Sequence, residues 1–155
     1  MKTSRLLSIF LIAAFFSFSA NLNAQCTGKG KALETIGALS GMSCYDAYSA
    51  IGAVADGFEK DVYKGDYVKE IMTEEKTMLM NLDSSYIDLM NSGFITNQDD
   101  KDFIAQVRKT LGYLISEANA LANYSDGKSA SDADEFQSYR DKAWKEISSM
   151  LGFGD

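Results

Sequence analysis

Residues 66–93 (DYVKEIMTEEKTMLMNLDSSYIDLMNSG) carry the longest helix signal in the chain, and this stretch most constrains the fold. Its apolar residues recur at steps of three, four or seven, which places them on one face of a helix with 3.6 residues per turn. The stripe consists of Val68, Met72, Leu79, Leu82, Tyr86 and Met90. Glu75 interrupts this stripe at its centre, where the spacing calls for an apolar side chain. The stretch therefore predicts a long amphipathic helix with one misplaced carboxylate.

Similar periodic stretches predict helices over residues 43–63, 96–124 and 131–152, and a short helix over residues 32–40. The chain contains no proline, which would interrupt helices, and its connecting segments are short. Short connections make consecutive helices antiparallel neighbours. The sequence therefore predicts an all-α fold, an up-and-down four-helix bundle with an additional short N-terminal helix. Residues 25–155 have the size of a single helical bundle domain.

Residues 1–24 have the three parts of a cleaved signal peptide. Lys2 and Arg5 give a positive start, residues 6–18 are apolar or small apart from two serines, and Ala24 supplies a small residue at the expected cleavage point. The apolar run is shorter than the roughly 20 residues that span a bilayer, so a retained anchor is disfavoured. The prediction is export to the periplasm or outside the cell, with no membrane span after cleavage.

Cleavage makes the chain more acidic. Without Lys2 and Arg5, 13 of the 15 basic residues remain against all 22 acidic residues, a net charge of about −9. Such a surface repels nucleic acids and anionic membranes, so neither is an expected partner. A basic protein or a cation is favoured electrostatically.

The two cysteines, Cys26 and Cys44, would enter an oxidising compartment on export. They are predicted to form a structural disulfide, which would close a loop of about 19 residues and stabilise the fold by on the order of 3 kcal/mol. Free thiols or a redox pair are the alternative, but the spacing is not C-x-x-C. A lipid anchor at Cys26 is disfavoured because the bulky Gln25 precedes it.

Arg140 interrupts the buried face of the last helix, as Glu75 interrupts that of the long helix. In an up-and-down bundle both helices begin at the same end, and both residues lie roughly 12 to 14 Å from it. The sequence therefore predicts a buried ion pair between Glu75 and Arg140 that fixes the register of the helices. A polar ligand pocket lined by the pair is the functional alternative.

Met80 and Ile87 lie seven residues apart on a line away from the main stripe of the long helix. They would be covered by the short first helix or form a small partner-binding patch. Four methionines in the same stretch could hold Cu(I), but methionine more often fills gaps in a core. The acidic runs lack the spacing of a calcium-binding loop, and the chain has no histidine for a di-iron site. No metal or cofactor is predicted.

The absence of histidine also removes the usual activating base of serine and cysteine nucleophiles. The chain has no G-x-S-x-G nucleophile motif and no phosphate-binding glycine loop, so it is not predicted to be an enzyme. The predicted function is an exported, non-catalytic protein-binding module with an acidic surface, such as an inhibitor, an immunity-type protein or an accessory subunit. The alternative is a bundle that carries a small apolar ligand. A cavity among five predicted core residues would favour the carrier: Tyr48, Phe58, Leu79, Tyr86 and Leu114.

Overall fold

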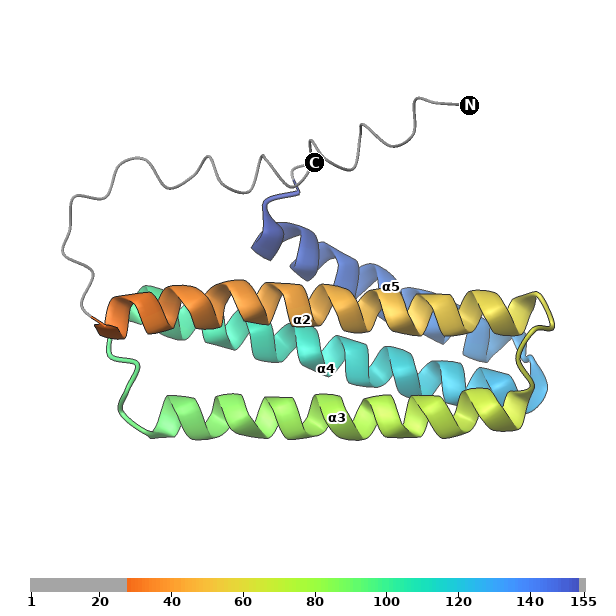
Figure 1. The fold of residues 1–155 in the computed structure, drawn as a ribbon. Coiled ribbons are helices and arrows are strands. Elements are labelled where there is room, and N and C mark those ends of the chain that lie inside the picture. Colours follow the sequence, from red (N-terminus) through yellow and green to blue (C-terminus); the bar gives the residue numbers. More distant parts are fainter. Residues whose placement is uncertain (1–27, 154–155) are drawn as a thin grey trace, which may run out of the picture. The chain divides into compact units, whose positions relative to one another are not determined.

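The computed structural model describes residues 28–153, which form four helices joined by short turns, with no strand in this part of the chain. The helices are α2 (Gly28–Glu59), α3 (Gly65–Asn91), α4 (Gln98–Gly127) and α5 (Ala130–Leu151). Residues from Ala32 onwards belong to one compact unit, whose helices alternate in direction (Figure 1). The predicted all-α bundle is confirmed for these residues. The predicted signal peptide and Cys26 lie outside them.

The first helix corrects one prediction. Residues 32–40 are the first part of α2 and do not form a separate short helix, because α2 continues through Gly37 and Gly41. These glycines permit close helix packing: a Cβ atom on Gly41 would lie 2.9 Å from Leu151 Cδ2, and one on Gly37 would meet the ring of Phe103. Glycine lowers helix propensity by only about 1 kcal/mol, which packing of a 32-residue helix overrides.

The remaining helix ends agree with the predicted ones to within a few residues, as is usual for helix boundaries. Gly93 follows the end of α3, and Gly152 ends α5, both with the positive φ that glycine adopts readily. The side chain of Asn97 accepts a hydrogen bond at the start of α4, and that of Ser129 does the same for α5. These caps satisfy backbone N–H groups that have no partner inside the helix.

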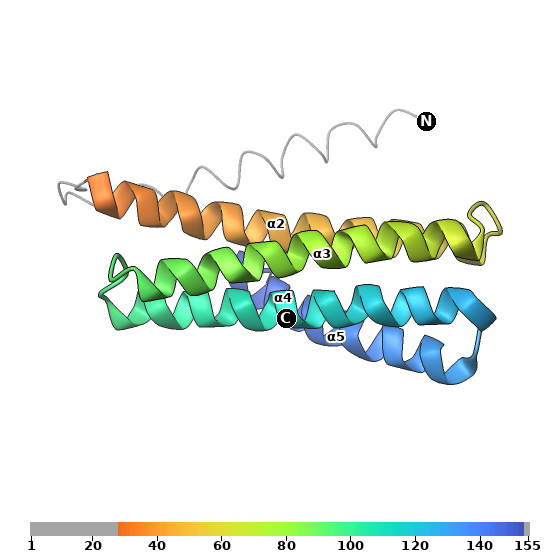
Figure 2. The same ribbon diagram turned by 90° about the horizontal axis from the view of Figure 1, so that it is seen from below.

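Helix α4 packs against both α3 and α5 (Figure 2). Helix α2 contacts α3 through a hydrogen bond between the hydroxyls of Ser40 and Tyr86, and it contacts α5 where Leu151 meets Gly41. The helices therefore pack in a ring, in which α3 and α5 occupy diagonal positions. This arrangement decides which side chains can meet inside the bundle.

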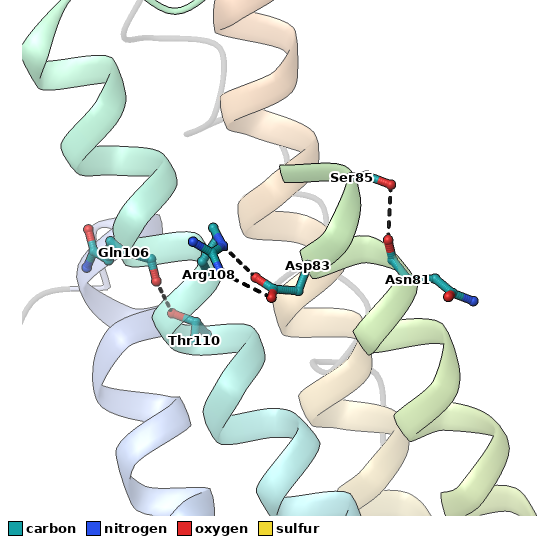
Figure 3. A network of polar contacts seen from close by, with 6 residues as sticks. All are labelled: Asn81, Asp83, Ser85, Gln106, Arg108 and Thr110. Carbon is teal, nitrogen blue, oxygen red and sulfur yellow. Dashed lines mark hydrogen bonds and ion pairs between the residues drawn. The ribbon is translucent and has the colours of Figure 1, made fainter. Parts of the chain in front are cut away.

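The core takes residues from every helix. Four residues of the predicted stripe on α3 are buried, namely Val68, Met72, Leu79 and Tyr86, and Leu82 and Met90 pack against them. At the edge of the core, Arg108 of α4 donates two hydrogen bonds to the carboxylate of Asp83 on α3, at 2.8 and 3.3 Å (Figure 3). Within the described residues, no helix is both long enough and apolar enough to cross a membrane.

Candidate functional site

Arg140 forms a buried ion pair, but its partner is Glu117 on α4 rather than the predicted Glu75 on α3. Its Nη1 atom donates to Glu117 Oε1 at 2.7 Å and to the backbone carbonyl of Tyr48 at 3.2 Å. The side chain of Glu117 is 0% exposed and that of Arg140 is 21% exposed. The predicted pair would span a diagonal of the bundle, whereas α4 and α5 are neighbours. Glu75 is instead half-buried on α3, where burial raises the pKa of its carboxyl.

The cost of burying the Glu117 carboxylate is only partly offset by its ion pair with Arg140. Burial raises its pKa to about 7, and the hydrogen bond and charge of Arg140 offset only part of this effect. Its second oxygen, Oε2, is buried and has no hydrogen-bond partner among the described residues. A buried acceptor left unpaired costs free energy, so the ion pair is an energetically costly polar element in a mainly apolar core.

Four aromatic side chains extend from this ion pair to the surface, and we call them the aromatic patch: Tyr45, Tyr48, Trp144 and Phe153. The guanidinium of Arg140 lies 3.9 Å above the ring of Tyr48. The centroid of the Trp144 ring lies 5.4 Å from that of Tyr48 and 6.2 Å from that of Phe153. Tyr45 packs against Trp144 and Phe153, with centroids 6.5 and 6.3 Å away. These distances are typical of interacting aromatic pairs.

The helix ends and helix faces explain why these rings gather. Gly152 takes a left-handed conformation with φ of 67°, and the N–H of Phe153 then donates to the carbonyl of Ser148. This turn folds Phe153 back onto Trp144. Three rings of the patch remain in contact with solvent, since Tyr45 is 41%, Trp144 39% and Phe153 38% exposed.

Two adjoining cavities form a groove beside the aromatic patch, between α2 and α5. The larger, of about 460 Å³, is lined by residues that include Gly52, Asp56 and Arg140. The smaller, of about 280 Å³, is lined by residues that include Leu121, Tyr124 and Ala133. Four residues line both cavities: Ala55, Glu59, Phe136 and Gln137. A cavity among five core residues would have favoured a carrier of apolar ligands, but none of the five lines either cavity: Tyr48, Phe58, Leu79, Tyr86 and Leu114.

Cys44 lies in the core, where burial raises the pKa of its thiol to about 12. A thiol with so high a pKa is unreactive. Its predicted partner, Cys26, lies outside the described residues, so the bridge between them stays a prediction.

Met80 and Ile87 are both exposed on α3, so the start of α2 does not cover them. Their role as a partner patch stays a prediction. Among the residues that the structure describes, no three histidine, cysteine, aspartate or glutamate side chains gather closely enough to hold a metal ion.

Sequence reasoning missed Glu117, Trp144 and Phe153. Glu117 had a usable signal, because it falls three residues after Leu114 and four before Leu121, on the apolar face of α4. Comparisons of the whole chain with known protein families, curated proteins and solved structures found no match.

Proposed function

We propose that this protein is an exported, non-catalytic binding module that recognises a basic protein through the aromatic patch. The observation that carries the proposal is the cluster of exposed rings around Trp144, the only tryptophan in the chain. Tryptophan and tyrosine are enriched among residues that contribute most to binding energy at protein interfaces. A solvated cluster of such residues is therefore the strongest partner-binding feature in the described part of the chain.

Charge supports a basic partner. The mature chain would carry a net charge of about −9, with 13 basic and 22 acidic residues. Asp46 follows Tyr45 on α2, and Asp141 lies near Tyr48, where its negative charge adds to the effect of burial in raising the pKa of that hydroxyl. Lys145 is the basic neighbour of Trp144. A lysine or arginine of a partner could stack on the exposed rings and pair with these carboxylates.

Two observations support a non-catalytic role. The sequence contains no histidine, and the thiol of Cys44, the one cysteine among the described residues, is buried with a raised pKa. A carrier of purely apolar ligands is less well supported, because charged residues, Asp56 and Arg140, line the larger cavity of the groove.

Affinity capture with patch variants tests the proposal. The mature protein is immobilised and exposed to the envelope fraction of its own cells, beside the double variant Tyr45→Ser/Trp144→Ser. We expect the wild type to capture one protein with a basic surface, and the double variant to capture none of it. The amount captured by the wild type should fall at high salt.

The matched control is Met80→Ser/Ile87→Ser, which removes two exposed apolar side chains from α3. It should capture the partner as well as the wild type does. If the Tyr45/Trp144 variant still captures the partner and the Met80/Ile87 variant does not, the interface lies on α3 and the assignment to the aromatic patch is wrong. Melting curves of both variants should each show one cooperative transition, which checks that the variants remain folded.

A further inference from the structure

The groove between α2 and α5 brings three kinds of chemistry together. Its larger cavity contains a cation, Arg140, and a carboxylate, Asp56. Its smaller cavity is lined mainly by apolar and aromatic groups, among them Leu121, Tyr124 and Ala133. Phe136 lines both cavities, so they adjoin each other. Together they have the size of a typical small-molecule site.

Arg140 has hydrogen-bonding capacity left for a ligand. Both of its hydrogen bonds, to Glu117 and to the Tyr48 carbonyl, leave from Nη1. Its Nη2 and Nε atoms donate no hydrogen bond to any residue in the described part of the chain. A guanidinium has five N–H donors in a planar fork, and a carboxylate is its best-matched acceptor.

Gly52 fixes the position of this guanidinium. A Cβ atom at Gly52 would clash with the Nη2, Cζ and Nη1 atoms of Arg140, so the guanidinium lies close against the backbone of α2. Asp56 follows Gly52 by four residues, which places its side chain one helical turn further along the same face. The cation and the carboxylate are therefore neighbours along one wall of the groove.

Asp56 is the carboxylate that remains most available to a ligand. Its ion pair with Lys60 is long, at 3.7 Å, and both side chains are largely exposed, so the pair is weak. The other carboxylate of the groove, Glu59, already accepts a hydrogen bond of 2.6 Å from the hydroxyl of Tyr124. A positively charged ligand group would therefore bind Asp56 in preference to Glu59.

We propose that the groove binds a free α-amino acid with an apolar side chain. The ligand carboxylate binds the Nη2 and Nε edge of Arg140, its ammonium group binds Asp56, and its side chain enters the smaller cavity beside Leu121 and Tyr124. A simple anion would be repelled by Asp56 and Glu59, and a simple cation by Arg140. A zwitterion satisfies both charges. This site adjoins the aromatic patch through Arg140, but none of the four patch residues lines it, so either proposal can fail without the other.

Isothermal titration of the mature protein with L-leucine and L-phenylalanine tests the site. Each ligand group has its own control: leucinamide lacks the carboxylate, N-acetyl-leucine lacks the ammonium group, and glycine lacks the apolar side chain. We expect saturable binding of the two amino acids, and binding at least about tenfold weaker for each control, because each loses one charged or apolar contact. The absence of saturable binding up to about 10 mM, or equal binding of leucine and leucinamide, would overturn the proposal.

Two variants assign the ligand groups to the groove. Asp56→Asn should weaken leucine binding about tenfold, whereas Glu34→Gln, at an exposed glutamate on the same helix outside the groove, should leave it unchanged. Ala133→Phe fills the smaller cavity and should weaken phenylalanine binding more than glycine binding. All three positions lie outside the buried core, so folding should be retained, which circular dichroism checks. Unchanged leucine affinity in Asp56→Asn would contradict the assignment.

Discussion

Replacing Arg140 with methionine is expected to lower the free energy of unfolding by about 3 to 5 kcal/mol at pH 8. The reason is the carboxylate that remains. Glu117 is fully buried and has Arg140 as its ion-pair partner, so the variant leaves an unpaired negative charge in the core. Urea denaturation followed by circular dichroism measures the loss. At pH 5 the loss should be smaller, since the carboxyl of Glu117, with its pKa near 7, is then neutral.

The matched control is the double variant Glu117→Met/Arg140→Met, which removes both charges and keeps similar volumes. Replacing a buried ion pair with apolar residues is often neutral or stabilising, so the double variant should recover most of the stability that the single variant loses. If the double variant is as unstable as Arg140→Met alone, the loss comes from the packing of Arg140 on Tyr48 and not from the orphaned charge.

The stability of the wild type is expected to fall as the pH rises from about 4.5 to about 7. In the folded protein the pKa of Glu117 is raised from 4.5 to about 7, so the folded state binds this proton more tightly than the unfolded state does. The stabilisation is fully present below pH 4.5 and is lost as the pH rises through 7. A shift of this size corresponds to on the order of 3 kcal/mol.

Glu117→Gln is the control for this pH dependence. The glutamine side chain cannot ionise, so the free energy of unfolding of the variant should change less between pH 4.5 and 7. The difference in stability between variant and wild type should therefore be smallest at low pH and should grow in favour of the variant as the pH rises. Glu75 contributes a slope of the same sign, because burial also raises the pKa of its carboxyl. The difference between the two pH profiles isolates Glu117. Parallel profiles for wild type and variant would contradict the assignment.

The sequence predicted the bundle because its helix signals are local. The stripe on α3, the turn at Gly93 and the stop at Gly152 all depend on neighbours within a few residues. The same local reasoning ended the short first helix at residue 40, whereas α2 continues through Gly41. The packing at Gly41 depends on Leu151, which is distant in the sequence.

The partner of Arg140 was mispredicted for a similar reason. Height along the helices suggested Glu75 as the partner, but height does not say which helices are neighbours. Glu117 lies on the adjacent α4 and meets Arg140 there. The disulfide prediction depends on cysteine count and compartment, which carry no geometry, and it stays a prediction because Cys26 lies outside the described residues.

The aromatic patch could not be predicted from helix periodicity. Trp144 lies one position after the buried Ala143, and Phe153 lies beyond the last helix, so neither belongs to an apolar stripe. Their contact depends on the turn at Gly152 and on the approach of α2 to α5. Sites of this kind combine residues from two helices and from the segment that follows one of them. The periodicity of a single helix does not predict them.

The fluorescence of Trp144 tests the proposed interface most directly, because it is the only tryptophan in the chain and lies within the aromatic patch. The mature protein is titrated with the captured partner, or with a fragment of it that contains no tryptophan. Burial of the indole at the interface should shift its emission to shorter wavelength and reduce quenching by acrylamide. Binding of the partner with unchanged emission and unchanged quenching would show that the interface lies elsewhere.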